Sequence, residues 1–129
     1  MKKSLFTVND WQENFVFEKK IAHARACYTM IGELVGSVEV DYSIYYLHYN
    51  EEDIHASTSR FEGFAVFNGE INGKKGSFAY YDCGSFINNQ YQASIEILKD
   101  TGTGDFKGIK GKGTYQPTEK GMELSLALI

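Results

Sequence analysis

The chain has 129 residues and a formal net charge of −4 at pH 7, which fits one domain over 1–129 and argues against a nucleic-acid surface. Basic residues occur at most in pairs, such as Lys2-Lys3 and Lys74-Lys75, so a polybasic membrane anchor is not expected either. No apolar run reaches the roughly 18 residues of a membrane helix, and the first ten residues lack the apolar segment of a signal peptide. We therefore expect a cytoplasmic protein with no nucleic-acid and no membrane partner.

The composition favours an all-β fold. The chain contains nine Phe, nine Tyr and thirteen Gly but a single Pro. Because open sheets often protect their edges with proline, its scarcity suits a sheet that closes on itself. Two cysteines, Cys27 and Cys83, are too few for a disulfide framework, so we expect two free buried thiols.

Alternating apolar and polar residues predict strands along the whole chain. The expected strands are 4–8, 14–20, 22–31, 37–49, 56–67, 75–83 with an extension to 86, 91–98, 112–116 and 122–128. The clearest is 37–49, where Val38, Val40 and Tyr42 alternate with Glu39 and Asp41. This two-residue period is typical of a strand and not of a helix.

Turn signals separate these strands, and no segment has a convincing helical period. Glycine-bearing or asparagine-bearing turns are expected at 32–36, 68–69, 72–73 and 88–89, and a charged turn at 50–53. Sequential antiparallel strands at this spacing form either a sandwich or an up-and-down barrel. Of the two, we predict an antiparallel up-and-down β-barrel of about eight strands.

The segment 102–113 holds five glycines, with Phe106 and Ile109 placed singly between them. Its glycine spacing matches neither a P-loop nor a dinucleotide-binding loop, and a strand pattern follows where those motifs need a helix. Glycine allows tight turns and close backbone approach. We therefore predict a tight loop whose two apolar residues tuck onto the core.

Several motifs resemble those of an uncharacterised bacterial family, the domain-of-unknown-function family 3224. They are Phe6-Thr-Val8 with Trp11, Gly73-Lys-Lys-Gly-Ser-Phe78 with Gly84-Ser-Phe86, and the glycine segment at 102–113. The resemblance covers nearly the whole chain and implies an allene-oxide-cyclase-like β-barrel, but no settled function.

The resemblance also bears on individual acids. Val40-Asp41-Tyr42 matches an acidic strand of the family, Phe64 and Ala65 stand where the family often has a Glu, and Asp82 stands where it often has a His.

Two strand-borne acids, Asp41 and Asp82, are the candidate catalytic residues. If both pointed into the barrel, one carboxyl would have a raised pKa and act as an acid while the other acted as a base. With Arg25 or Arg60 orienting the substrate, this would suit hydrolysis by activated water, and the family resemblance implies a hydrolase of the aspartic-peptidase or self-cleaving kind. The alternative is that these acids face solvent or pair with basic residues, as charges on alternating strands usually do. No metal or cofactor is expected, because the three histidines lack zinc-ligand spacing.

A surplus of aromatic residues supports a different function. The expected interior rings are Phe15, Phe17, Tyr42, Tyr46, Phe64, Phe78 and Tyr80. An eight-stranded barrel either fills with side chains or holds one small ligand. We predict binding of a small apolar or aromatic molecule, with Tyr42, Tyr46, Tyr80, Arg25, Arg60 and Glu62 as candidate ligand contacts. The alternative is a homo-oligomeric module without a pocket, in which the extra rings cover a subunit interface.

Overall fold

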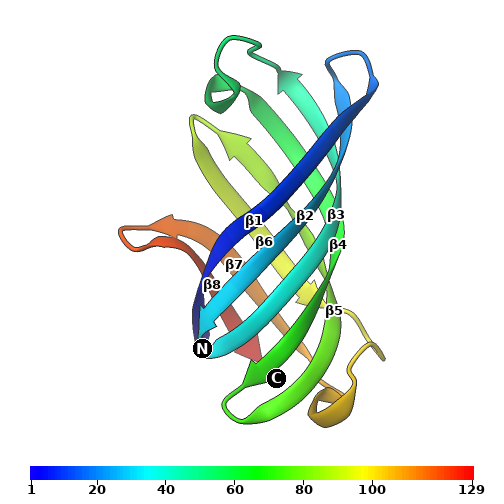
Figure 1. The fold of residues 1–129 in the computed structure, drawn as a ribbon, viewed down its shortest axis with the longest axis vertical. Helices are drawn as coiled ribbons and strands as arrows, with labels where there is room; N and C mark the ends of the chain where they lie inside the picture. The colour runs from blue at the N-terminus through cyan, green and yellow to red at the C-terminus, as the bar shows by residue number, and fades with distance from the viewer.

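The computed structural model describes residues 1–129 as one closed barrel of eight antiparallel strands (Figure 1). The strands are β1 (Lys2–Phe17), β2 (Ile21–Gly32), β3 (Leu34–His48), β4 (Thr58–Ile71), β5 (Lys74–Ile87), β6 (Gln90–Ile97), β7 (Gly111–Thr118) and β8 (Gly121–Leu128). Each strand pairs with the next along the chain, and β8 returns to pair with β1. The predicted up-and-down barrel is confirmed.

Helical structure is limited to two single turns of 3-10 helix, η1 (Ile54–Ala56) and η2 (Gly104–Phe106). No helix in the structure is long and apolar enough to cross a membrane.

The alternation along each strand decides which side chains fill the barrel. In β3, Val40 and Tyr42 are buried, whereas Glu39 and Asp41 between them are exposed. The neighbouring strand β2 contributes only Ala22, Ala24 and Ala26 to this part of the core. Small residues on one strand leave interior space for the tyrosine rings of the others, as in other small barrels.

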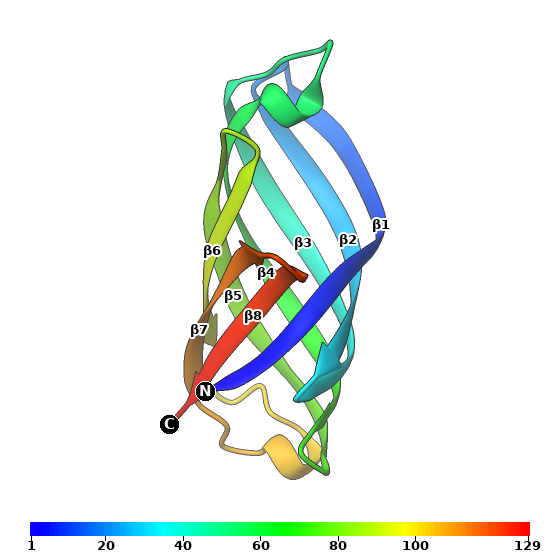
Figure 2. The same cartoon turned by 90° about the vertical axis from the view of Figure 1, so that its left-hand side faces the viewer.

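The barrel wall is much shorter on one side than on the other. Strands β1 to β5 have 12 to 16 residues, whereas β6, β7 and β8 have eight each. Pairing of β1 with β8 stops at Phe6, although β1 continues to Phe17. Figure 2 shows the β7–β8 hairpin ending partway along the barrel, while β1 and β6 continue beyond it on either side. We call the opening between β1 and β6 above this hairpin the side window.

Two predicted breaks lie inside strands. Asn9 and Asp10 were expected to end the first strand, but β1 passes through them with a register shift between Val8 and Asp10. Such a shift inserts a residue without ending the strand.

Asn68-Gly69 was expected to be a turn but belongs to β4, whereas the turn also predicted at Asn72-Gly73 is confirmed. At Gly69 a Cβ atom would clash with the Val35 carbonyl oxygen of β3, so glycine permits close strand approach there and not a turn.

The glycine segment covers one end of the barrel. Phe106 of η2 is 3% exposed and packs edge-on against Phe78, with ring centroids 5.5 Å apart. The loop is fastened to β5 because Asp105 accepts a hydrogen bond from the Lys75 N–H at 2.9 Å and Thr103 accepts one from the Ser77 N–H at 3.1 Å. The prediction that the two apolar residues of this loop tuck onto the core is confirmed. Phe106 is part of the buried core, which the loop closes like a plug, and Ile109 packs against the core partly buried.

Candidate functional site

A pocket of about 610 Å³ occupies the side window. Residues of β1, the β5–β6 hairpin, the β7–β8 hairpin and η1 contribute to its wall, and nine of its 14 lining residues are hydrophobic. Val8 and Trp11 stand on the β1 side, and Pro117 and Met122 stand on the hairpin below. The pocket exists because three short strands leave the upper part of β1 without a partner on one side.

A hydrogen-bonded cluster lies where this pocket meets the barrel core. Tyr28 and Tyr91 belong to the pocket lining, and both contact the hydroxyl of Tyr42, at 2.7 Å and 3.3 Å. Tyr42 in turn donates to Oδ2 of Asp82 at 2.7 Å. We call these four residues the tyrosine–aspartate cluster. It connects the apolar pocket to a carboxyl group inside the barrel.

Asp82 is the only buried charged residue of the core. Its side chain is fully buried, and Oδ1 has no hydrogen-bond partner. Burial raises the pKa of Asp82 to about 7, and the hydrogen bond from Tyr42 offsets part of this rise. A carboxyl with this pKa can hold or release a proton near neutral pH.

The tyrosines around Asp82 behave differently. Burial raises the pKa values of Tyr28, Tyr42 and Tyr91 above their ordinary range, so these hydroxyls keep their protons at neutral pH. Burial likewise raises the pKa values of Tyr80 and Tyr115, which are hydrogen-bonded to each other deeper in the core. Within this buried group, only Asp82 changes its charge near neutrality.

Glu13 organises the mouth of the pocket. It accepts a hydrogen bond from the Trp11 indole N–H at 2.9 Å and another from the Tyr46 hydroxyl at 2.5 Å. The Tyr46 ring also contacts Phe15 and Tyr49, with centroids 5.7 Å and 5.1 Å away. These contacts fix the rings that border the pocket on the side away from the β7–β8 hairpin.

The structure divides the predicted site residues between the two faces of the wall. Tyr42, Tyr46, Tyr80 and Asp82 point inward and are buried. The side chains of Asp41, Arg25, Arg60 and Glu62 are on the outer face. The prediction that Asp41 and Asp82 share one site is wrong in its geometry. Asp41 is paired across β3 and β4 with Phe64, which is 64% exposed, whereas Asp82 follows the inward alternation of Phe78 and Tyr80.

On the outer face, Asp41 joins a small network of charges. Its carboxylate lies 3.4 Å from the Arg25 guanidinium and 3.6 Å from His23, and Arg25 also lies 3.4 Å from Glu39. Glu62 accepts a hydrogen bond from the Tyr81 hydroxyl, also outside the barrel. For Asp41 and Glu62, these arrangements match the alternative in which the strand acids face solvent or pair with basic residues.

Replacing Asp41 with Asn should change the free energy of unfolding by less than about 1 kcal/mol, because an exposed ion pair contributes little. Urea unfolding of the two proteins at pH 7 measures this difference. A loss well beyond this range would mean that the Asp41 network holds the wall together and is not a surface feature.

Several aromatic residues differ from expectation. Phe17 and Phe64 were expected inside, but they are 53% and 64% exposed. Trp11 is 42% exposed at the side window.

Three residues of the site, Tyr28, Tyr91 and Glu13, were not among the predicted site residues. Tyr28 shares the even-numbered face of Ala22, Ala24 and Ala26, so its alternation could have placed it inside.

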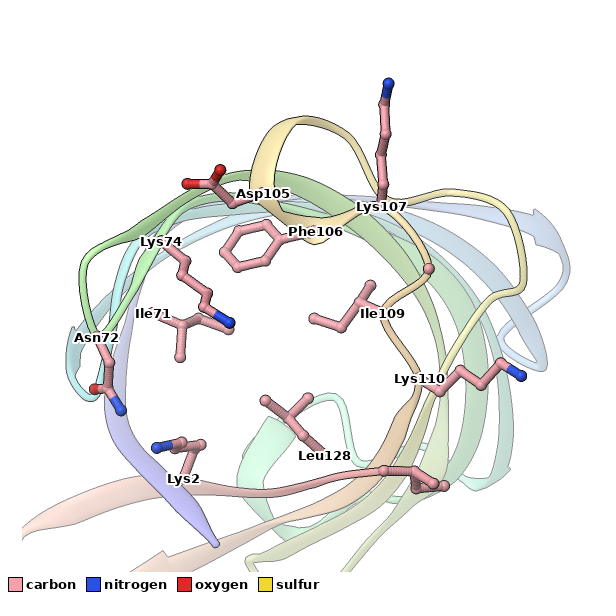
Figure 3. A pocket seen from close by; sticks show the side chains of 12 residues that line it. Lys2, Ile71, Asn72, Lys74, Asp105, Phe106, Lys107, Ile109, Lys110 and Leu128 are labelled. Atoms are coloured by element: carbon pink, nitrogen blue, oxygen red, sulfur yellow. The ribbon is translucent and has the colours of Figure 1, made fainter.

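A second pocket, of about 350 Å³, lies at the end of the barrel covered by the glycine segment (Figure 3). Its lining includes the apolar residues Ile71, Phe106, Ile109 and Leu128. In Figure 3 the side chain of Lys74 reaches toward the opening, whereas Lys107 points away from it. This smaller pocket has no buried titratable group, so we place the candidate site at the side window.

No group of three or more His, Cys, Asp or Glu side chains is arranged to hold a metal ion. Cys27 and Cys83 are free and only partly buried, so the expectation of buried thiols holds in part.

Comparisons with known proteins agree with the fold. A model of the family described as "Protein of unknown function (DUF3224)" matches residues 2–128. The chain is also similar to the crystal structure of a protein of unknown function from the DUF3224 family of Shewanella oneidensis MR-1. The TM-score is 0.79 and the identity 14%, over 98% of this chain and 93% of that one. No curated protein matches the sequence. Because the family model spans almost the whole chain, this protein belongs to the DUF3224 family.

Proposed function

We propose that this barrel binds a small, largely apolar or aromatic molecule in the pocket at the side window. The observation that carries the proposal is the pocket itself, which has a volume of about 610 Å³ and mostly hydrophobic walls. Pockets for small molecules usually measure about 300–1,000 Å³ and combine apolar walls with a few polar groups that orient the ligand. Here Tyr28 and Tyr91 supply such polar groups.

The geometry gives less support to hydrolysis by a pair of carboxylates. Asp82 has no second carboxylate beside it, and Asp41 lies on the other face of the wall. The remaining acid of the pocket, Glu13, already accepts hydrogen bonds from Trp11 and Tyr46. Binding of a small molecule therefore explains more features of this pocket than hydrolysis by paired carboxylates does.

The proposal can be tested by narrowing the pocket. Val8 lines the pocket and Val66 does not, yet both valines lie on the barrel and are 49% exposed. We expect the uncharged fluorescent probe N-phenyl-1-naphthylamine to bind the native protein with one-to-one stoichiometry. Val8→Trp should raise the Kd of this probe about tenfold, which corresponds to a loss of about 1.4 kcal/mol in binding free energy. The matched control Val66→Trp should leave the Kd of the probe unchanged.

Thermal unfolding gives an independent readout of the same binding. A ligand present at about 100 times its Kd should stabilise the native protein by about 2.7 kcal/mol. Equal probe binding by both tryptophan variants would contradict the pocket assignment. Absence of binding across a panel of uncharged aromatic compounds would favour a module without a ligand.

A further inference from the structure

The direction of the hydrogen bonds in the tyrosine–aspartate cluster depends on whether Asp82 carries a proton. When Asp82 is ionised, Tyr42 donates to Oδ2, and the oxygen of Tyr42 accepts from Tyr28 at 2.7 Å or from Tyr91 at 3.3 Å. A tyrosine hydroxyl has one proton to donate. Each tyrosine that donates to Tyr42 therefore offers only oxygen lone pairs to the pocket.

A proton on Asp82 reverses this chain. Protonated Oδ2 donates to the Tyr42 oxygen, so Tyr42 donates its own proton to Tyr28 or Tyr91. The hydroxyl that receives this bond can then donate into the pocket. Protonation of one buried carboxyl thus frees one additional hydrogen-bond donor at the pocket wall.

The surroundings of Asp82 favour this protonated arrangement. Oδ1 is fully buried without a partner, and an ionised carboxylate in that position loses hydration without a compensating hydrogen bond. At the mouth, the Trp11 N–H and the Tyr46 hydroxyl already donate to Glu13. These two donors are therefore already engaged within the wall, whereas protonation of Asp82 frees a tyrosine proton at the buried end of the pocket.

We propose that the ligand of this pocket carries a carbonyl oxygen at its buried end, that Tyr28 or Tyr91 donates a hydrogen bond to it, and that its binding places a proton on Asp82. The ligand class is thus an aromatic or alicyclic ketone, a choice that rests on the proposed function of the pocket. Binding and protonation are thermodynamically linked, so the ketone should bind more tightly at lower pH.

Within the core, Asp82 is the group whose protonation can produce this pH dependence, because the titratable groups around it keep their protons near neutral pH. Tyr28, Tyr42, Tyr80, Tyr91 and Tyr115 surround it from five strands, and burial raises all of their pKa values above the ordinary range. At the mouth, Glu13, Tyr46 and His55 are the other titratable lining residues, and burial raises the pKa of Tyr46 above the ordinary range. The experiment therefore includes a variant of His55.

Two probes of matched shape test the proposal: 2-acetylnaphthalene, which is a ketone, and 2-isopropylnaphthalene, which has no oxygen. For the native protein, the Kd of the ketone should rise about tenfold between about pH 5.5 and pH 8.5, because an unsatisfied buried polar group costs about 1–3 kcal/mol, or roughly 5-fold to 150-fold. The Kd of the hydrocarbon should stay constant. Calorimetry in two buffers of different ionisation enthalpy should show proton uptake when the ketone binds at pH 8.

Asp82→Asn and His55→Gln complete the test. The amide introduced by Asp82→Asn can donate to Tyr42 at every pH, so this variant should bind the ketone with a pH-independent Kd and without proton uptake. His55→Gln should keep the native pH dependence. A pH-independent ketone Kd in the native protein, or loss of the pH dependence in His55→Gln, would overturn the assignment to Asp82 while leaving pocket binding intact. Failure of both probes to bind at either pH would overturn the proposed function itself.

Discussion

Replacing Asp82 with Asn is expected to raise the free energy of unfolding at pH 8 by about 4 kcal/mol. Asp82 is fully buried, and burial raises its pKa from 3.8 to about 7 in the folded protein. Each unit of pKa difference between folded and unfolded states corresponds to about 1.4 kcal/mol. Asn has nearly the same shape and carries no charge, so the variant avoids the cost of holding an ionised carboxylate in the core.

The pH dependence of this effect has a definite sign. At about pH 3 the carboxyl is protonated in both states, so it adds no pH-dependent term. Between about pH 4 and pH 7 the unfolded chain has lost the proton while the folded protein still holds it, so the native protein loses stability as the pH rises. Above about pH 7 both states are ionised, and the loss is complete.

Urea unfolding of the native protein and Asp82→Asn at several pH values between 4 and 8 measures the difference. The gap between the two stabilities should widen with pH up to about pH 7 and then stay constant. Asp41→Asn, which changes an exposed carboxylate, is the matched control and should not show this widening. A constant gap for Asp82→Asn would mean that its carboxyl titrates alike in the folded and unfolded chains.

Phe106→Ala is expected to lower the free energy of unfolding by about 3–5 kcal/mol, the usual cost of removing a buried phenylalanine ring. The ring is 3% exposed and packs on Phe78 and Phe67, with centroids 5.5 Å and 6.5 Å away. Its loss would leave a cavity at the end of the barrel that the glycine segment covers. Thermal or urea unfolding at pH 5 to 6 measures the change.

Lys107→Ala is the matched control for the plug, because Lys107 follows Phe106 directly and is exposed. Its substitution should change the stability by no more than about 0.5 kcal/mol, as is usual for surface positions. Equal effects of the two substitutions would show that the loop contributes through its backbone hydrogen bonds to β5 and not through the Phe106 ring.

Strand alternation allowed much of the fold to be predicted. Val38, Val40 and Tyr42 share one face because successive side chains of a strand point to opposite sides. The same rule placed Asp82 beside Phe78 and Tyr80, and Asp41 opposite Tyr42. Alternation therefore assigned the correct face to each acid, but the idea of a catalytic pair required both to point inward.

The turns were predicted less well, because glycine has more than one structural use. Asn72-Gly73 forms a turn with positive φ angles at both residues, whereas Gly69 lies where strands β3 and β4 come too close for a side chain. Local sequence does not separate these two uses, since the second depends on a neighbouring strand.

By itself, the sequence determined the antiparallel course of the strands, most of the inward aromatic residues and the loop that carries Phe106. These features follow from neighbouring residues through side-chain alternation and turn preferences. Tertiary structure alone decided where the wall is incomplete and which polar groups meet inside it. The window depends on β1 extending past the end of β8, and the tyrosine–aspartate cluster joins residues from four strands, among them Tyr42 and Tyr91, which are 49 positions apart. Closure of the barrel brings them together, and no local pattern encodes that distance.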